Sequence, residues 1–275
     1  MAENIVFIGG GNMARSLIGG LLQAQHPQQN LFVVDPNTQA RQLLRSQFDI
    51  AIESTAEKVL SQADVVLLAV KPQVLKEVCV ELAPIFKQRP CLVISIVAGI
   101  KLSSINHWLG GDYPIVRVMP NTPALIGEGA SGLYANPKVS EKQKEIAQNI
   151  VSAVGTTVWV SSEKLLNVVT ALSGSGPAYH FYFMEIMIRW ATAAGLPENI
   201  AKTLTLNTAK GAALMALSND MEVDELRRQV TSKGGTTEAA LKSLESENLE
   251  RLLSRALEAA NQRADQLAKE LGESQ

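Results

Sequence analysis

The first residues that could do chemistry form a glycine-rich stretch near the start of the sequence. Gly9, Gly11 and Ala14 have the spacing G-x-G-x-x-A, directly after an apolar run and before a helix-forming segment. In this pattern the first glycine allows a tight turn, the second leaves room for a pyrophosphate, and the alanine lets helix and strand pack closely. The free N–H groups at the start of the helix attract an anion. The pattern predicts a dinucleotide-binding turn, and a glycine-rich turn without a ligand is the alternative.

An acidic residue follows the next apolar run. Asp35 comes directly after Leu31–Val34, 24 residues after Gly11. A carboxylate about 20 residues after the glycines is typical of the group that hydrogen-bonds the adenosine ribose. An Asp-Pro-Asn turn that only ends the strand is the alternative. A carboxylate here also repels a ribose 2′-phosphate, although Arg41 lies close enough along the chain to offset that charge.

Polar residues also follow two later apolar runs. Lys71 precedes Pro72 after one run, and Asn121 lies in a Pro-Asn-Thr-Pro stretch after another. Because ligands of open α/β sheets lie outside the carboxyl ends of the strands, we expect both side chains at the cofactor edge. The two prolines fix the backbone around Asn121, which suits a wall of a nicotinamide or substrate site. A solvated lysine and a plain turn are the respective alternatives.

Two stretches rich in glycine, serine and threonine interrupt the later part of the sequence. Leu172–Pro177 breaks one predicted helix and starts another, with Pro177 at a position that begins helices. Thr231–Glu238 contains Gly-Gly-Thr-Thr and precedes a further predicted helix, so its backbone N–H groups suit a carboxylate. Helix capping by serine, threonine and glycine is the alternative for both stretches.

Signatures of other chemistries are missing from the sequence. The histidines are His26, His107 and His180, and none has another metal ligand at a suitable spacing, so we expect no metal site. The sequence contains no G-x-S-x-G turn of a serine hydrolase and no phosphate-binding P-loop. Among the chemistries considered, hydride transfer by a bound dinucleotide is the one still consistent with the sequence, and it needs no nucleophile from the protein.

Composition narrows the class of protein further. Charged residues make up 19% of the 275 residues and the formal net charge is −2, which argues against binding to nucleic-acid phosphates. Hydrophobic residues, at 46%, favour a large buried core. The apolar segment Cys91–Ile100 is too short to span a bilayer, and no signal peptide is recognisable. With two cysteines, Cys79 and Cys91, we expect reduced thiols in a cytoplasmic protein without a membrane span.

The elements that must position these residues change in character near Ser161. Before it, short apolar runs alternate with helix-length segments, which is typical of buried parallel strands. The predicted strands are Ile5–Ile8, Leu31–Val34, Val65–Val70, Leu92–Val97, Ile115–Val118 and Thr156–Val160. After it, helix formers at 3.6-residue spacing replace these runs. The predicted fold is α/β followed by all-α, with a Rossmann-type doubly wound sheet in residues 1–161 and a helical domain in residues 162–275.

Two segments of the helical half carry further expectations. Ala178–Trp190 is apolar nearly all round, so we expect a helix that is buried centrally or in a subunit interface, and at least an obligate dimer. Glu245–Glu273 mixes acidic and basic residues and predicts one helix with a solvated face.

Together these motifs resemble those of the Δ1-pyrroline-5-carboxylate reductase family, nearly from end to end. The resemblance rests on five motifs in this order: Phe7–Met13, Ala69–Pro72, Arg117–Pro123, Leu172–Tyr179 and Gly234–Thr237. It implies reduction of the cyclic imine pyrroline-5-carboxylate to L-proline with NADPH or NADH, the last step of proline biosynthesis. It also implies an N-terminal Rossmann domain and a C-terminal helical dimerisation domain, in a homodimer that often assembles further into a decamer.

The resemblance also assigns roles to residues. Those expected to contact the dinucleotide are Ile8, Gly9, Gly10, Gly11, Asn12, Met13, Asp35, Asn37, Ala69, Val70, Lys71, Pro72 and Ala98. Those expected to hold the substrate are Ser232, Gly234, Gly235, Thr236 and Thr237, with Asn121 and Ser175 as further candidates. Thr237 is the predicted catalytic residue, because its hydroxyl would hydrogen-bond the ring nitrogen and orient the C=N bond toward the nicotinamide. We therefore expect the active site between the two domains.

Two positions differ from the family's pattern, and two rival functions stay open. Lys233 stands where proline is usual, which bears on the rigidity of the substrate loop. Asp35 stands where a small polar residue is often found, so NADPH and NADH both stay open. One rival is a β-hydroxyacid dehydrogenase, for which Lys210 is the mid-helix candidate for catalysis. The other is a dinucleotide-sensing regulator without catalysis, which would have no reason to keep Gly-Gly-Thr-Thr.

Overall fold

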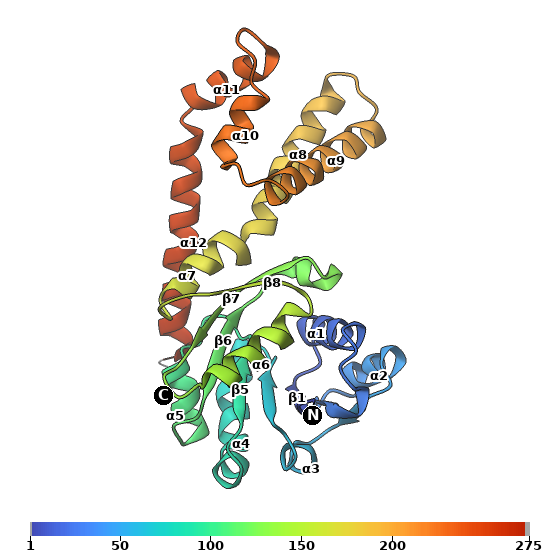
Figure 1. Ribbon diagram of the computed structural model, residues 1–275, viewed down its shortest axis with the longest axis vertical. Coiled ribbons are helices and arrows are strands. Elements are labelled where there is room, and N and C mark those ends of the chain that lie inside the picture. Colours follow the sequence, from blue (N-terminus) through green and yellow to red (C-terminus); the bar gives the residue numbers. More distant parts are fainter. Residues whose placement is uncertain (1, 273–275) are drawn as a thin grey trace. The chain divides into compact units, whose positions relative to one another are not determined.

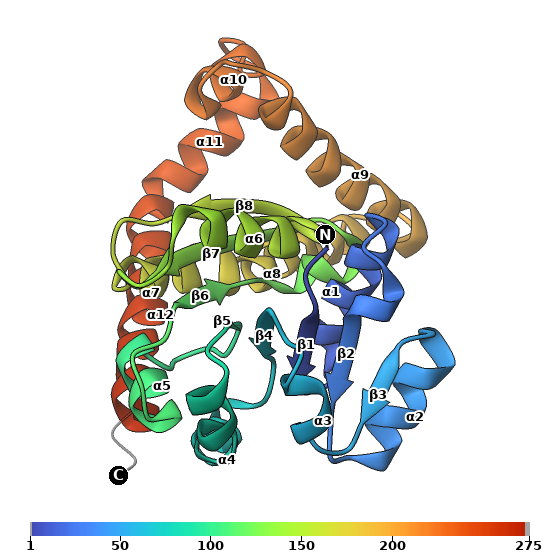
Figure 2. The same ribbon diagram turned by 60° about the horizontal axis from the view of Figure 1, so that its bottom comes forward.

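A computed structural model of the protein describes residues 2–272, and its N-terminal part is built on an eight-stranded sheet (Figure 1). The strands are β1 (Ile5–Ile8), β2 (Leu31–Val34), β3 (Ala51–Glu53), β4 (Val65–Leu68), β5 (Leu92–Ser95), β6 (Ile115–Met119), β7 (Gly129–Ala135) and β8 (Gly155–Trp159). Their order is β3-β2-β1-β4-β5-β6-β7-β8, and Figure 2 shows them from β3 on the right to β5 on the left. All neighbouring strands are parallel except β6 and β7. An order that runs outward on both sides of β1 makes the sheet doubly wound.

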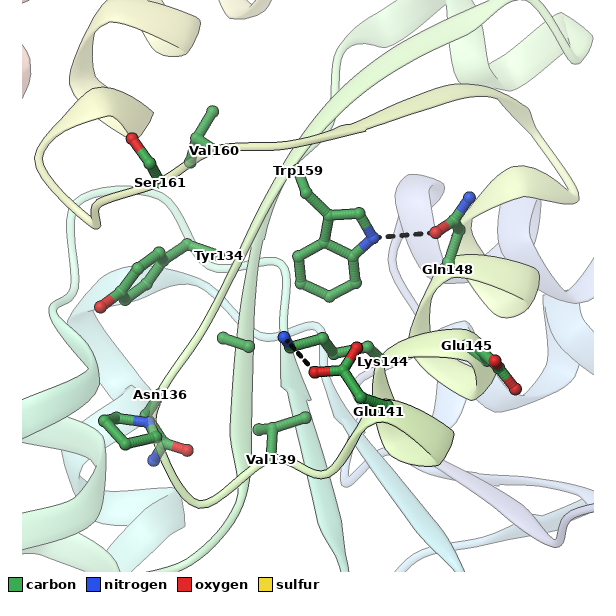
Figure 3. A pocket seen from close by; sticks show the side chains of 12 residues that line it. Tyr134, Asn136, Val139, Glu141, Lys144, Glu145, Gln148, Trp159, Val160 and Ser161 are labelled. Atoms are coloured by element: carbon green, nitrogen blue, oxygen red, sulfur yellow. Dashed lines mark hydrogen bonds and ion pairs between the residues drawn. The ribbon is translucent and has the colours of Figure 1, made fainter.

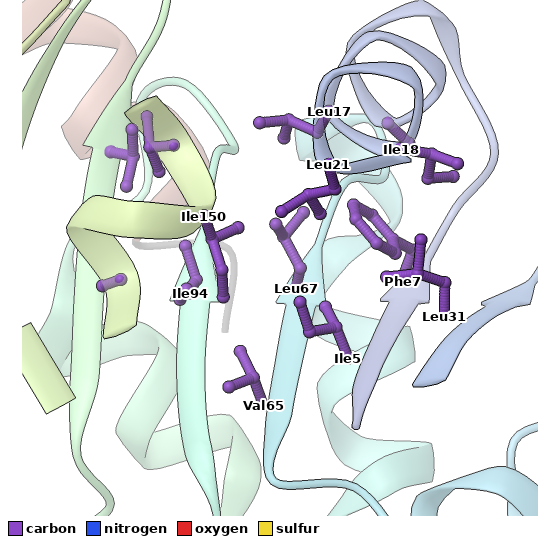
Figure 4. Packing of buried hydrophobic residues seen from close by; sticks show 14 of the residues in the cluster. Ile5, Phe7, Leu17, Ile18, Leu21, Leu31, Val65, Leu67, Ile94 and Ile150 are labelled. Carbon is purple, nitrogen blue, oxygen red and sulfur yellow. The ribbon is translucent and has the colours of Figure 1, made fainter. Parts of the chain in front are cut away.

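Each side of the sheet has its own helices. Helices α1 (Asn12–Gln23), α2 (Thr38–Gln47) and α6 (Glu141–Ser152) cover the side on which Ile5 and Phe7 pack against Leu17 (Figure 4). Helices α3 (Glu57–Leu60), α4 (Leu75–Gln88) and α5 (Leu102–Leu109) cover the other side, with Val6 and Ile8. Because both sides are covered, every residue of β1 is buried, which explains its unbroken apolar sequence.

The structure corrects the predicted strands in two ways. It adds β3 and β7, which the sequence analysis does not predict, so β8 pairs with β7 rather than with an earlier strand. It also ends β4 at Leu68 and β5 at Ser95, two residues before their predicted ends. The residues that follow are therefore loop rather than strand, which leaves Ala69–Lys71 and Ala98 outside the sheet.

The chain divides into two units. Unit 1 is Met1–Ser175 together with Ala260–Gln275, and unit 2 is Gly176–Ala259. Unit 1 extends past the predicted boundary at Ser161 because α7 (Leu165–Val169) packs on β6 and β7. It also includes the last part of α12 (Leu249–Gly272), in which Leu271 lies beside Gly99.

Unit 2 consists of helices: α8 (Gly176–Ala193), α9 (Glu198–Leu217), α10 (Val223–Gln229), α11 (Thr236–Ser246) and the first part of α12. The expectation of one helix from Glu245 to Glu273 is wrong at its start, because Asn248 has a φ of 59° and separates α11 from α12. Glu273 lies outside the described residues.

The helix predicted over Ala178–Trp190 is confirmed as α8, which packs against α9. Its large side chains are nevertheless exposed in the single chain: Phe181 is 64% exposed and Trp190 is 72% exposed. An exposed apolar face of this kind favours the subunit interface over central burial. Within residues 2–272, no helix combines the length and apolar character needed to cross a membrane.

Candidate functional site

The residues predicted to contact a dinucleotide collect at one edge of the sheet in unit 1. Strands β1, β2, β4 and β5 are parallel, so their carboxyl ends lie at the same edge. At or shortly after these ends come Ile8, Gly9, Gly10, Gly11, Asn12, Met13, Asp35, Asn37, Ala69, Val70, Lys71, Pro72 and Ala98. Ligands of doubly wound sheets bind at this edge, where the strand order reverses.

Within the glycine-rich turn, Gly9 is required by the fold itself. It has a φ of 100°, and its N–H donates to the Val34 carbonyl at 2.8 Å. A Cβ at this position would lie 2.8 Å from the Ala69 carbonyl oxygen. A side chain would therefore strain the backbone and collide with the end of β4.

Gly11, in contrast, is not required by any contact within the described chain. It precedes α1 with φ −69° and ψ −178°, which any residue adopts, and a Cβ there would meet nothing within 4 Å. In the described residues no side chain caps α1, so the N–H groups of its first turn are left for an anion. The open space in front of Gly11 and the uncapped helix together fit a pyrophosphate.

Asp35 supports this turn from the neighbouring strand. Its Oδ2 accepts a hydrogen bond from the Gly10 N–H at 2.8 Å, and its Oδ1 accepts one from the Asn37 N–H at 2.8 Å. Arg41 donates to the carbonyls of Asp35 and Pro36, each at 2.8 Å, rather than to the carboxylate. The Asp35 carboxylate therefore ties β2 to the glycine-rich turn, and the guanidinium shapes the start of α2.

The end of β4 completes the edge. The Ala69 N–H donates to the Ile8 carbonyl at 2.8 Å, which joins this strand end to the glycine-rich turn. Lys71 follows as an exposed residue and precedes the short 3-10 helix η2 (Pro72–Val74). Ala98, after β5, is exposed as well. The small residues at this edge thus allow a ligand to approach the backbone closely, and the Lys71 amine can attract an anionic group of that ligand.

Asn121 and Ser175, two of the predicted substrate residues, also lie in unit 1. The buried Asn121 side chain accepts from the Ala130 N–H at 2.9 Å and donates to the Ser173 carbonyl at 3.1 Å. The Ser175 N–H donates to the Thr170 carbonyl at 2.8 Å and closes a π-helical turn, η4 (Thr170–Gly174). Such turns are frequent at functional sites. Asn121 therefore fixes the loop after β6 to this turn.

The other predicted substrate residues lie in unit 2, where Ser232, Gly234 and Gly235 belong to a tight turn and Thr236 and Thr237 begin α11. The Gly235 N–H donates to the Ser232 carbonyl at 3.0 Å, and Gly234 has a φ of 74°, as in a type II turn. Gly235 precedes α11 without a side-chain cap among the described residues. The N–H groups of Thr236 and Thr237 are therefore available at the helix start, where a carboxylate binds favourably.

Sequence reasoning misses one residue of this loop. The Glu238 Oε2 accepts a hydrogen bond from the Gly234 N–H at 2.7 Å, and Oε1 lies 3.3 Å from the Lys242 Nζ. A glutamate in the third position of a helix often accepts from the N–H of the N-cap residue in a capping box, whereas Glu238 reaches one residue further back, to Gly234. The signal in the sequence is a glutamate two positions after Thr236, which indicates such a bond only once the start of the helix is known.

A pocket of about 730 Å³ lies elsewhere in unit 1, among α6, β7 and β8 (Figure 3). Four of its polar side chains form two pairs. Lys144 pairs with Glu141 at 2.7 Å, and the Trp159 Nε1 donates to the Gln148 Oε1 at 2.8 Å. None of the predicted site residues lines this pocket.

The cysteines are not suited to nucleophilic chemistry. Both are free thiols, and burial raises the pKa of Cys79 and of Cys91 to about 12. Since the thiolate is the nucleophile, both groups are unreactive near neutral pH. Across residues 2–272, no three His, Cys, Asp or Glu side chains are grouped so as to hold a metal ion.

Two family models match the chain. Residues 4–99 match a family described as NADP oxidoreductase, coenzyme F420-dependent, which covers the glycine-rich edge. Residues 163–267 match a family described as pyrroline-5-carboxylate reductase dimerisation, which covers the Ser232–Gly235 turn and α11.

Whole-length relatives agree with these models. A pyrroline-5-carboxylate reductase of Pseudomonas aeruginosa is 50% identical over 270 residues, which are 98% of this chain and 98% of that protein. A solved structure of a pyrroline-5-carboxylate reductase from Coxiella burnetii has a TM-score of 0.94 and 43% identity, covering 98% of this chain and all of that one. The Plasmodium falciparum pyrroline carboxylate reductase, solved with NADP bound, has a TM-score of 0.84 and 30% identity over 97% of this chain and 98% of its own. With its doubly wound sheet and its helical dimerisation region, the chain belongs to the pyrroline-5-carboxylate reductase family of NAD(P)H-dependent oxidoreductases.

Proposed function

We propose that the protein reduces 1-pyrroline-5-carboxylate to L-proline, the last step of proline biosynthesis, and that the predicted residues carry out the binding and the chemistry. The observation that carries the proposal is the 50% identity that extends over 98% of the chain. Similarity of this extent includes both the glycine-rich edge of unit 1 and the Gly234–Thr237 stretch of unit 2. The β-hydroxyacid dehydrogenase and the regulator without catalysis have no comparable support.

The edge at β1, β2, β4 and β5 holds the cofactor in this proposal. Gly11 and the N–H groups of α1 would hold the pyrophosphate, and the exposed Lys71 amine would add positive charge at the same edge. Asp35 holds the turn through Gly10 and stands near the adenosine ribose. When bound, NADPH, or NADH as the alternative, supplies the hydride.

The turn before α11 holds the substrate carboxylate. The N–H groups of Thr236 and Thr237 are available at the helix start for the carboxylate, and the positive end of the helix dipole favours a negative charge there. The Ser232 hydroxyl lies directly beside this point, since a Cβ on Gly235 would be 2.5 Å from its Oγ. It can therefore add a third donor to the same carboxylate.

Thr237 performs the catalytic role. Its exposed hydroxyl donates a hydrogen bond to the ring nitrogen and fixes the orientation of the C=N bond. As hydride reaches the imine carbon, the π electrons of the C=N bond move to the nitrogen, which becomes more basic, so this hydrogen bond strengthens. A proton from water then completes the amine. An interaction that strengthens along the reaction lowers the barrier more than it tightens binding of the substrate.

In this proposal Asn121 and Ser175 shape the wall of the substrate site. Both polar groups of the Asn121 side chain form hydrogen bonds to the backbone, at Ala130 and at Ser173. It therefore shapes the substrate wall by fixing the loop after β6, and Ser175 lies at the end of the π-helical turn that this bond holds.

The assembly follows from the exposed face of unit 2. Phe181 and Trp190 are too exposed for a stable single chain, so a homodimer covers α8 and α9. Further assembly of dimers into a decamer is supported by the resemblance to the family alone. The enzyme acts in the cytoplasm on a small-molecule substrate, without nucleic acid or membrane as a partner.

A spectrophotometric assay of NADPH oxidation with pyrroline-5-carboxylate tests the function. We expect oxidation that depends on the substrate and yields proline in equal amount. A protein that oxidises a β-hydroxyacid with NADP but leaves the imine unchanged would support the dehydrogenase. Binding of NADPH without turnover of either substrate would support the regulator.

A further inference from the structure

We propose that Glu238 is a positioning residue, which holds the Ser232–Gly235 turn in the shape that binds the substrate carboxylate. The inference rests on the proposed function of this turn. In this turn, Lys233 stands at the position at which a proline would normally restrict the backbone.

The turn has type II geometry, with Lys233 and Gly234 as its two central residues. Such turns favour proline at the first central position and glycine at the second. Gly234, with its φ of 74°, meets the second preference. Lys233 does not meet the first, because its φ is free to vary where a proline ring would fix it near −65°. The turn is therefore less restricted by its own sequence than its geometry suggests.

Glu238 supplies a restraint from outside the turn. Its Oε2 accepts from the N–H of Gly234, the second central residue, at 2.7 Å. Its Oε1 lies 3.3 Å from the Lys242 Nζ one helical turn further on, and its side chain is only 30% exposed. The carboxylate is thus held at both oxygens, and the middle of the turn is tied to the first turn of α11.

This tie matters because the proposed substrate donors belong to the same backbone. The Thr236 and Thr237 N–H groups follow directly after the turn, which closes with the bond from the Gly235 N–H to the Ser232 carbonyl, so their directions depend on the conformation of the turn. A rigid turn keeps these donors oriented before the substrate arrives, which lowers the entropic cost of binding. Glu238 therefore affects binding of the substrate through the turn and leaves the cofactor edge of unit 1 unaffected.

Two variants at position 238 separate this role from a general effect on α11. Glu238→Ala removes the acceptor, whereas Glu238→Gln keeps an oxygen that can accept from Gly234. Glu245→Ala is the matched control, since it removes an exposed carboxylate from the other end of the same helix. Each variant is measured by amide hydrogen exchange at Gly234 and by the KM values for pyrroline-5-carboxylate and NADPH.

With Glu238→Ala we expect faster exchange at Gly234 and a KM for pyrroline-5-carboxylate raised roughly tenfold, as for the loss of one charge-assisted hydrogen bond. The KM for NADPH should stay within about twofold, which is close to the precision expected for an unaffected site. Glu238→Gln and Glu245→Ala should resemble the original protein in all three measurements. Unchanged exchange in Glu238→Ala would show that the bond is not formed in solution and would overturn the proposal.

Lys233→Pro in the Glu238→Ala background tests the mechanism itself. No described residue accepts a hydrogen bond from the Lys233 N–H, so proline removes no bond and restores stiffness by another route. We expect the KM for pyrroline-5-carboxylate to return toward its original value while exchange at Gly234 stays fast. A KM that remains high would overturn the proposal, because stiffness would not be what Glu238 provides. If the unaltered protein fails to reduce the imine, the proposed function fails separately, while the exchange measurement still reports on the bond.

Discussion

Gly11→Ala distinguishes a glycine kept for the cofactor from one kept for the fold. The backbone at Gly11 suits alanine, and the added methyl group meets no protein atom within 4 Å. The free energy of unfolding of the free protein should therefore change by less than about 1 kcal/mol, because the reduced flexibility of the unfolded chain and the poorer N-cap preference of alanine act in opposite directions. The same methyl group occupies the space that a pyrophosphate needs. We expect NADPH binding to weaken by about 1.4–2.8 kcal/mol, roughly 10- to 100-fold in Kd.

Gly9→Ala is the matched control for this prediction. Its φ of 100° and the 2.8 Å approach of its Cβ to the Ala69 carbonyl oxygen should lower the free energy of unfolding by about 1–3 kcal/mol. Urea unfolding of the free protein gives the stabilities, and titration of NADPH fluorescence gives the Kd values. The reasoning is refuted if Gly11→Ala binds NADPH like the original protein, or if it destabilises the free protein as much as Gly9→Ala does.

Three further changes test single residues. Asp35→Ser removes the carboxylate that we propose to stand near the ribose, so the ratio of kcat/KM for NADPH to that for NADH should rise several-fold. An unchanged ratio would mean that the carboxylate serves only the backbone of Gly10 and Asn37. Thr237→Ala should lower kcat roughly 10- to 100-fold, which corresponds to a loss of about 1.5–3 kcal/mol of transition-state stabilisation, while Thr237→Ser should keep most of the rate. A Thr237→Ala variant with full kcat and reduced thermal stability would show that Thr237 only caps the helix. Because burial raises the pKa of Cys79 from 9.0 to about 12, the folded protein holds this proton more tightly than the unfolded chain. Its contribution to the free energy of unfolding should be constant below about pH 9 and fall between about pH 9 and 12. Urea unfolding tests this, and a Cys79→Ala variant whose free energy of unfolding falls as much over this pH range as that of the original protein would contradict it.

The parallel strands could be predicted because each is covered on both faces. Ile5–Ile8 is buried at every position, so its sequence is an unbroken apolar run. The strand β7 gives no such signal, because neighbouring elements leave room only for glycine at two of its positions. A Cβ on Gly132 would lie 2.7 Å from a methyl group of Val169, and one on Gly129 would lie 2.8 Å from the Val154 carbonyl oxygen. Close packing at these two positions interrupts the apolar run by which a buried strand is recognised.

In the candidate site, features set by neighbouring residues in the sequence could be predicted, whereas contacts between distant segments could not. The turn from Gly9 to Gly11 could be predicted because its spacing follows from the covalent chain. The bond from the Gly10 N–H to Asp35 could not, since it depends on the pairing of β1 with β2. The bond from Gly234 to Glu238 lies within five residues of sequence, but its acceptor becomes evident only once the start of α11 is fixed.

Transfer of a labelled hydride tests the central claim most directly. The protein is incubated with pyrroline-5-carboxylate and NADPH that carries deuterium at the transferable position of the nicotinamide, and the product is analysed by mass spectrometry and NMR. We expect L-proline with one deuterium atom, bound to the carbon of the former C=N bond. Proline without deuterium, or no proline from a protein that binds both ligands, would contradict direct hydride transfer to the imine.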